Sequence, residues 1–296
     1  MPLPCYHRGM PGRPAPESAA EADCPQCGGR GWIVARDGGA GTARPCPCRE
    51  VGRGARLLEA AGIPAKYLGC TLDRFNTQRP GERGSRDQLV QALQRAADYV
   101  EGFARPEGGF RESGLLFIGP PGVGKTHLAV AVLLDLVRTY RLRGRFVDFT
   151  TLIHQIQSTF DPSSPESKHE VLDPVMGADV LVLDELGAQK PTPWVQDILY
   201  LVINTRYTRR LPTLFTTNYR LDDGPEAAPA PREGEYEEFG RPRGRGSLPP
   251  LKDRISSVLI SRLFEMTQPV VLSAVDDYRS WGSWGGRSKR RRLSPA

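Results

Sequence analysis

The segment that most limits how this chain can fold is Gly119–His127, with the sequence GPPGVGKTH, which directly follows the apolar run Leu115–Ile118. It has the pattern G-x-x-x-x-G-K-T of a loop that binds phosphate. Glycines let the backbone N–H groups of such a loop wrap a polyphosphate, and the helix that follows adds the positive end of its dipole. Because this loop works between a buried strand and a helix, the sequence predicts an α/β fold built around a nucleotide site.

The loop also predicts a role for its polar side chains. Lys125 is expected to reach the β- and γ-phosphates and to serve in catalysis, and the Thr126 hydroxyl is expected to hold Mg²⁺. The expected contacts with the nucleotide are Gly119, Pro120, Pro121, Gly122, Val123, Gly124, Lys125, Thr126 and His127.

A second segment, Val180–Glu185, reads VLVLDE and predicts a buried strand that ends in two carboxylates. Asp184 is expected to support Mg²⁺ at the nucleotide, and Glu185 to polarise the water that attacks the terminal phosphate. Either segment alone could occur by chance. Both together, each beside a suitable strand, predict a site that binds a nucleoside triphosphate with Mg²⁺ and hydrolyses it.

Four of the six cysteines lie within one short window, spaced C-x2-C and then C-x-C. They are Cys24, Cys27, Cys46 and Cys48. Four thiolates suit a closed, tetrahedral Zn²⁺ site of the structural kind, with no open position for catalysis. Because C-x-C is the less usual half, Cys5 or His7 could replace one ligand, and a disulfide is the alternative to zinc. Cys70 is expected to be a small buried residue.

Composition indicates where such a protein works. The formal net charge of +6 permits a nucleic-acid partner without requiring one. No apolar stretch approaches the roughly 18 residues of a membrane span, and the first residues lack the apolar core of a signal peptide. The expectation is a cytoplasmic protein with no membrane partner, in which cysteines stay reduced and zinc is favoured over a disulfide.

The chain divides by composition into five parts. Pro, Ala and Gly dominate its start, and Gly, Ser and basic residues dominate its end. The expected parts are a disordered N-terminus (1–22), a zinc-binding module (23–50), a linker with the first helices of the ATPase region (51–113), the ATPase domain (114–279) and a basic disordered tail (280–296). Within the ATPase domain, residues 222–250 lose the apolar pattern and are expected to form a disordered surface insertion.

From Gly114 onward, strand-like and helix-like segments alternate, which is typical of a parallel sheet with crossover helices. Strands are predicted at 115–118, 145–149, 180–184, 213–217 and 269–272. Helices are predicted at 52–61, 87–103, 125–140, 151–160, 193–209 and 252–264. Thr151 and Thr192 are the expected caps of two of these helices.

Several short phrases follow one another along the chain in a specific order. They are Ile63–Tyr67, Lys125–His127, Leu183–Gly187, Trp194–Val195, Ile203–Tyr207, Thr216–Tyr219, Ile260–Leu263 and Asp277–Arg279. In this order and spacing they resemble the bacterial helicase-loader ATPases of the AAA+ class, the DnaC/DnaI/IstB-like family. The cysteine window resembles zinc modules that precede some of these ATPases. The resemblance implies a P-loop NTPase (AAA+) fold, a parallel five-stranded sheet with helices on both faces, no C-terminal helical lid and a small N-terminal zinc module.

The resemblance also implies roles for three more residues. Asn218 matches the polar sensor that contacts the attacking water or the γ-phosphate, and its strand is expected between the two strands of the phosphate site. Arg262 matches the arginine finger that reaches the γ-phosphate of a neighbouring subunit, so a homo-oligomer is expected. Arg254 is the alternative finger, because it lies about two turns earlier on the same expected helical face.

The function that the resemblance implies is an ATP-dependent DNA replication protein. It would bind single-stranded DNA and load a replicative hexameric helicase onto it, with the N-terminal region holding the helicase. In the segment 145–177, Lys168 and His169 are the better candidates for DNA contact, whereas Phe146 is more typical of a core. The alternatives are an IstB-like transposition ATPase acting on duplex DNA with a transposase, and a nucleotide-gated adaptor without significant turnover.

Overall fold

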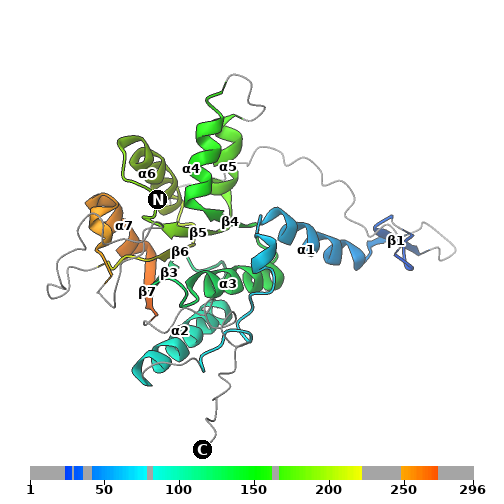
Figure 1. Cartoon of the computed structure of the whole chain (residues 1–296). Helices are drawn as coiled ribbons and strands as arrows, with labels where there is room; N and C mark the ends of the chain where they lie inside the picture. The colour runs from blue at the N-terminus through cyan, green and yellow to red at the C-terminus, as the bar shows by residue number, and fades with distance from the viewer. Residues whose placement is uncertain are drawn as a thin grey trace, which may run out of the picture. The chain divides into compact units, whose positions relative to one another are not determined.

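A five-stranded parallel sheet, in the order β4-β5-β6-β3-β7, forms the centre of the larger of two compact units (Figure 1). The strands are β3 Gly114–Ile118, β4 Gly144–Asp148, β5 Val180–Leu186, β6 Thr213–Thr217 and β7 Thr267–Val271. The predicted α/β fold with a parallel five-stranded sheet is therefore confirmed. The expected position of the strand before Asn218 is also correct, because β6 lies between β3 and β5.

The computed structural model describes residues 24–28, 30–35, 42–78, 83–161, 167–221 and 248–272. The smaller unit comprises Met1–Arg56 and the larger one Leu57–Ala296. Several sequence predictions lie outside the described residues: the possible ligands Cys5 and His7, the disordered N-terminus, most of the insertion, the Asp277–Arg279 phrase, the absence of a lid and the basic tail. Within the described ranges, no helix is both long and apolar enough to cross a membrane.

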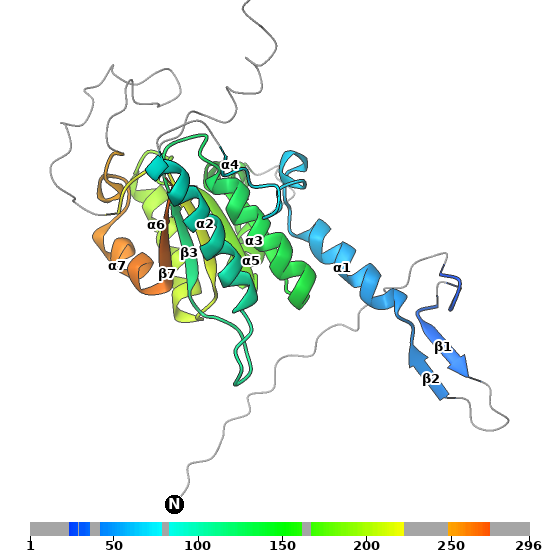
Figure 2. The same ribbon diagram turned by 90° about the horizontal axis from the view of Figure 1, so that it is seen from below.

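Helices cover both faces of the sheet (Figures 1 and 2). One face packs against α2 Arg83–Glu101 and α3 Lys125–Tyr140, and the other against α4 Phe149–Ser158, α5 Lys168–Gly177, α6 Pro193–Thr208 and α7 Ser257–Met266. Successive side chains of a strand point to opposite faces. In β3, Leu115 and Phe117 accordingly belong to one apolar cluster and Leu116 and Ile118 to the other. A strand that is buried on both faces explains why its sequence is continuously apolar.

The ends of the helices test the expected caps. Thr192 caps α6, because its side chain accepts a hydrogen bond from the N–H of Val195. The prediction for Thr151 is wrong. The cap of α4 is Asp148, whose carboxylate accepts from the N–H of Thr151 at 2.7 Å. The helix therefore begins two residues before Thr151, at Phe149.

Two helical elements differ from the sequence prediction. The predicted helix 252–264 is two elements, the 3-10 turn η2 Leu251–Asp253 and α7, which begins at Ser257. The helix α5 was not predicted. It begins with a capping box in which Ser167 and Glu170 each accept from the other's backbone N–H, and it contains Pro174.

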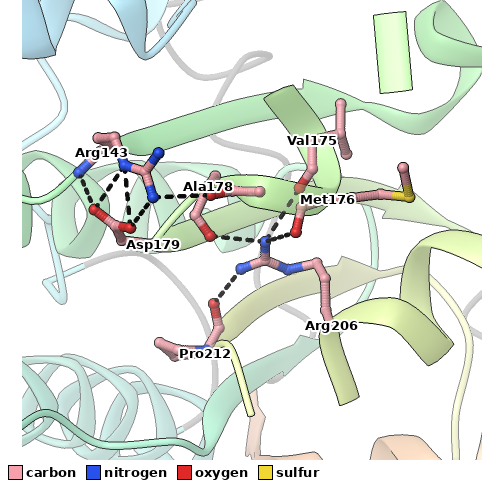
Figure 3. Close-up of polar contacts among 8 residues, drawn as sticks. Arg143, Val175, Met176, Ala178, Asp179, Arg206 and Pro212 are labelled. Carbon is pink, nitrogen blue, oxygen red and sulfur yellow. Dashed lines mark hydrogen bonds and ion pairs between the residues drawn. The ribbon is translucent and has the colours of Figure 1, made fainter. Parts of the chain in front are cut away.

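Arg206 of α6 joins three elements at the amino edge of the sheet (Figure 3). Its side chain is 1% exposed and donates to Oγ1 of Thr213, the first residue of β6, at 2.8 Å. Its other N–H groups reach backbone carbonyls at and beyond the end of α5 and before β6: those of Val175, Met176, Ala178 and Pro212. Burial lowers the pKa of Arg206 to about 9. A buried guanidinium thus satisfies carbonyls that a helix end leaves without partners.

The smaller unit is a hairpin followed by a helix. Strand β1 Trp32–Ala35 pairs antiparallel with β2 Thr42–Pro45, and α1 Cys48–Ala60 begins at the fourth cysteine of the window. The apolar cluster of this unit consists of four cysteines with Ile33 packed against them.

Candidate nucleotide site and four-cysteine centre

The phosphate loop connects β3 to α3, as its sequence pattern requires. Gly122 and Gly124 have positive φ angles of 80° and 104°, which L side chains rarely adopt, and Gly124 is the residue before α3. At Gly119 a Cβ atom would lie 2.5 Å from the carbonyl oxygen of Leu272. The loop therefore needs glycine at these three positions for its path into the helix.

Lys125 is the first residue of α3 and is only 7% exposed. Its Nζ donates a hydrogen bond to the carbonyl oxygen of Pro120, within the same loop, at 2.8 Å. The ammonium group is thus held over the loop, on the side where a phosphate chain would lie.

Thr126 and Asp184 meet across the carboxyl end of the sheet. Oγ1 of Thr126 donates to the Asp184 carboxylate, 2.9 Å from Oδ1, and Oγ1 of Thr216 lies 2.5 Å from the same oxygen. Burial raises the pKa of Asp184, whereas the hydrogen bonds from Thr216 and Thr126 oppose the rise. Hydroxyl and carboxylate oxygens are the donors that Mg²⁺ prefers, so Thr126 and Asp184 fit the cation expected between them.

Glu185 lies in an irregular part of β5. Its φ angle is 60°, and the pairing register between β5 and β6 shifts between Leu183 and Leu186. The N–H of Glu185 donates to Oγ1 of Thr216 at 3.0 Å, and its side chain is exposed beside buried Asp184. A bulge of this kind redirects a side chain. Here it leaves the first carboxylate buried against Thr126 and turns the second toward solvent.

Asn218 follows directly after β6 and is half-buried. Because β6 lies between β3 and β5, its carboxyl end lies between the phosphate loop and the two carboxylates. The structure therefore gathers five predicted site residues at one edge of the sheet, namely Lys125, Thr126, Asp184, Glu185 and Asn218. This is the edge at which open parallel sheets bind ligands.

The His127 side chain does not face the phosphate loop. Its Nε2 lies 2.8 Å from the carbonyl oxygen of Thr71, and its ring meets Phe75 edge to face at 5.5 Å between centroids. His127 instead fastens the segment 71–75 to the first turn of α3. Only its backbone lies at the helix start, where the predicted nucleotide contact would occur.

The two candidate finger arginines have different surroundings. Arg262 lies on α7, where its guanidinium carbon is 4.7 Å from the ring centroid of Tyr200 and 5.6 Å from that of Tyr207. Its Nη2 also donates to the hydroxyl of Tyr200 at 3.2 Å, so the contacts described for Arg262 lie on α6 and not at the phosphate loop of its own chain. Arg254 is not on α7, so the predicted shared helical face is wrong. It follows η2, and its guanidinium donates to the carbonyls of Gly187 and Ala188.

Sequence reasoning missed two residues that shape this edge. Thr216 bonds both Oδ1 of Asp184 and the N–H of Glu185, and Arg254 contacts the turn that follows Glu185. For Thr216 the signal was available, because it begins the phrase Thr216–Tyr219 that contains the predicted sensor Asn218. For Arg254 the pattern gave no sign of a contact within its own chain.

The four predicted cysteines come together in the smaller unit. Their sulfur atoms all lie within 4.8 Å of one another, and all four residues are buried. The pairs Cys24–Cys46 and Cys27–Cys48 are 3.7 and 3.5 Å apart. These separations exceed the roughly 2 Å of a disulfide and match the ~3.8 Å between sulfurs in a tetrahedron with Zn–S bonds of ~2.3 Å.

The environment of Cys27 favours its thiolate. Burial opposes ionisation, but a hydrogen bond from the N–H of Gly31, at 3.2 Å, and bonds with the neighbouring thiols lower the pKa of Cys27 to about 7. The donor set and its geometry thus fit a structural zinc ion. Cys70 lies apart from this cluster, and burial raises its pKa, as expected of a small core residue.

The candidates for DNA contact divide by exposure. Phe146 is 6% exposed and packs 5.8 Å from the ring of Tyr67, so it is a core residue. The sequence suggested a polar loop at Lys168 and His169, but both are in the first turn of α5. Of these two, His169 is exposed and Lys168 half-buried.

Comparison with known proteins gives consistent matches across the larger unit. The sequence profile of the family described as IstB-like ATP binding protein matches residues 108–225. The replicative helicase loader DnaC of Escherichia coli (strain K12) is 28% identical over 171 residues, which is 57% of this chain and 63% of DnaC. The protein YqaM of Bacillus subtilis (strain 168) is 26% identical over 186 residues, 61% of this chain and 56% of YqaM. The chain thus spans less than two thirds of the length of both relatives.

Among solved structures, the crystal structure of the DnaC helicase loader matches with a TM-score of 0.52 and 27% sequence identity. The match covers 71% of this chain and 99% of that one.

Proposed function

Because this chain is a member of the AAA+ helicase-loader family of ATPases, we propose that it binds and hydrolyses ATP at the carboxyl edge of its sheet and thereby loads a replicative helicase onto DNA. The observation that carries the proposal is the hydrogen bond of 2.9 Å between Thr126 and Asp184. It joins the phosphate loop to the acidic end of β5, as a nucleotide–cation site requires.

Each residue of the edge has a task in this proposal. Backbone N–H groups of the loop and Lys125 bind the phosphates, and Thr126 with Asp184 would hold Mg²⁺, which neutralises phosphate charge when bound. Glu185 accepts a proton from the attacking water, and its exposed carboxylate has the access that this step needs. Asn218 orients that water or contacts the γ-phosphate.

The arginine on α7 makes turnover depend on assembly. Arg262 acts on the nucleotide of a neighbouring copy, where an arginine finger contributes about 10³- to 10⁵-fold in rate. Its position against Tyr200 and Tyr207 of α6, away from the loop that begins α3, agrees with action in trans. A dilute monomer should therefore be a poor ATPase.

The proposed partners are inferred from the similarity to known proteins. DnaC is named a replicative helicase loader, and we assign the same class of partner to this chain: a hexameric replicative helicase held by the N-terminal region, and single-stranded DNA held by the ATPase domain. Exposed His169 at the start of α5 is a candidate DNA contact. The zinc ion would stabilise the module without taking part in hydrolysis. We place the protein in the cytoplasm.

Steady-state ATP turnover, measured across protein concentrations with and without single-stranded DNA, tests the proposal. We expect turnover to rise steeply with concentration and with DNA. Glu185→Gln should retain ATP binding and lose at least about 100-fold in kcat, because the amide cannot accept the proton. A full rate in that variant would remove Glu185 from the mechanism, and flat, negligible turnover despite ATP binding would favour the adaptor.

A second candidate is a transposition ATPase, which the description of the matching family profile, IstB-like ATP binding protein, favours. It would act on duplex DNA together with a transposase. Stoichiometric binding to a hexameric helicase would support the loader. Binding to duplex DNA and a transposase instead of the helicase would support this alternative.

A further inference from the structure

The turn that follows Asp184 contains two residues in the left-handed conformation. Glu185 has a φ angle of 60° and Gly187 one of 88°. Glycine adopts such angles freely, but for a residue with a side chain they are strained and persist only when surrounding contacts enforce them. The N–H of Ala188 closes the turn by donating to the carbonyl of Glu185 at 3.0 Å. The direction of the Glu185 carboxylate therefore depends on what holds the turn 185–188.

One side of this turn is held by β6. Oγ1 of Thr216 accepts from the N–H of Glu185 at 3.0 Å, and Oγ1 of Thr217 donates to the carbonyl of Leu186 at 2.9 Å. These contacts hold the first two residues of the turn. They do not reach Gly187 and Ala188.

The other side is held by Arg254. Its Nε donates to the carbonyl of Gly187 at 2.9 Å and its Nη2 to that of Ala188 at 3.2 Å. The guanidinium carbon lies 5.2 Å from the ring centroid of Tyr219, the residue after the sensor Asn218. A planar fork of donors suits two adjacent carbonyls, which the single ammonium group of lysine would not bind in the same way.

Arg254 is itself fixed by its neighbours. Its carbonyl accepts from Nε2 of Gln196 on α6 at 2.8 Å, and its N–H donates to the carbonyl of Leu251 at 2.9 Å. Leu251 is fully buried and packs against Gly187, where an added Cβ would approach its Cδ1 to 2.9 Å. The arginine thus approaches the turn from a segment packed into the core.

We propose that Arg254 is a positioning residue for hydrolysis, acting within its own chain by holding the carbonyls of Gly187 and Ala188 so that the Glu185 carboxylate stays aimed at the attacking water. This inference rests on the proposed ATPase function and gives Arg254 a role other than that of a trans-acting finger. It also gives the segment that leads into α7 a direct connection to the catalytic turn, three residues before the helix that carries Arg262 begins at Ser257.

The first test compares Arg254→Ala with Arg254→Lys, and with Arg209→Ala as the matched control, since Arg209 is exposed and outside the site. Arg254→Ala should lower kcat roughly 10- to 100-fold, because a misplaced catalytic group loses its near-attack geometry. The dissociation constant for ATP should change less than about threefold, because the phosphate loop is untouched. Arg254→Lys should fall between Arg254→Ala and the wild type. A kcat for Arg254→Ala equal to that of the control, or a loss that lies wholly in ATP affinity, would overturn the proposal.

A second test asks whether Arg254 works through Glu185. In a Glu185→Gln background, Arg254→Ala should cause no further loss, because the group that it positions has already been removed. An independent stabilising role would lower the residual rate by the full factor again and would contradict the proposal.

A mixing experiment separates action in cis from action in trans. When subunits with Arg254→Ala are mixed with Glu185→Gln subunits, turnover should follow the proportions of the two, since neither chain holds a complete site. The corresponding mixture of Arg262→Ala with Glu185→Gln should regain activity, because the second chain supplies the finger. Recovery in the first mixture would make Arg254 the finger and refute its role in cis.

Hydrogen exchange keeps the test independent of turnover. In the nucleotide-free protein, Arg254→Ala should speed amide exchange in a peptide that covers residues 183–190, relative to wild type and Arg209→Ala. If the wild type shows no turnover, the proposed function fails. Faster exchange in Arg254→Ala would still support the inference that Arg254 holds the turn 185–188. Unchanged exchange overturns it.

Discussion

The nucleotide edge and the four-cysteine centre both gather polar side chains, but different forces hold them in place. At the nucleotide edge, Thr126, Asp184 and Glu185 extend from strands and helices whose apolar residues are almost completely buried. In the part of the smaller unit that the structure describes, the buried cluster consists of the four predicted ligands, with Ile33 packed against them. The comparison teaches that one site is positioned by an extensive apolar core, whereas the other is itself the buried centre of its unit, so we expect only the second to need a metal ion for folding.

The largest expected effect is that of removing the metal. Structural zinc contributes about 10–16 kcal/mol to folding in small domains, so a strong zinc chelator should unfold the smaller unit and leave the sheet intact. We expect rapid proteolysis within residues 24–56, detected by mass spectrometry, together with unchanged ATP binding.

Cys27→Ser should have the same effect as chelation, and Cys70→Ser should retain the metal, since Cys70 lies outside the cluster. Equal protease resistance with and without bound metal would abolish the distinction between the two regions.

The next effect concerns the core of the larger unit. Arg206→Ala removes a guanidinium that bonds five oxygen atoms and leaves buried carbonyls without donors. We expect a loss of about 3–5 kcal/mol in the free energy of unfolding, measured with urea. Arg209→Ala, an exposed arginine on the same stretch of chain, should change it by less than about 0.5 kcal/mol.

Arg206→Ala should also leave the zinc content unchanged. A loss of metal in this variant would mean that the stability of the two regions is coupled.

The smallest expected effect tests whether the core positions the nucleotide edge through a single hydroxyl group. Thr216→Val keeps the shape of the side chain but removes the hydroxyl that bonds Asp184 and Glu185. We expect kcat to fall roughly 10- to 100-fold, because both carboxylates lose a shared constraint. Stability should change by only about 1–3 kcal/mol. Thr208→Val, at the exposed end of α6, is the control. A normal kcat would show that the strand backbone alone aims these carboxylates.

Much of the fold could be predicted because β3 and β5 contain continuous apolar runs, and strand-like and helix-like segments alternate along the chain around them. All five strands of the sheet lie within about two residues of their predicted bounds, and α3 has the predicted bounds Lys125–Tyr140. The gathering of Lys125, Asp184 and Asn218 follows from parallel strands that end at one edge. The domain boundaries and the catalytic roles stay predictions.

The misses have physical causes. Leu251, Ile255, Leu259 and Leu263 recur every fourth residue and are all buried, so the pattern indicates one helix where the chain forms η2 and α7. Pro174 obscured α5, although the capping box at Ser167 and Glu170 was readable in the sequence. The bulge at Glu185 and the contact of Arg254 with the turn after it arise from tertiary packing, which the spacing of apolar residues along the sequence does not indicate.

The end of the sheet at β7 has a consequence for solubility. Among the described strands β7 is the last in the sheet, and an unpaired strand edge can recruit strands from other molecules. Pro269, in the middle of β7, has no N–H to offer, and its carbonyl already accepts from Arg95 on α2 at 2.9 Å. Strand addition is therefore blocked at the centre of this edge. The assembly of copies that we propose for ATP turnover can then form without the addition of a strand at the centre of β7.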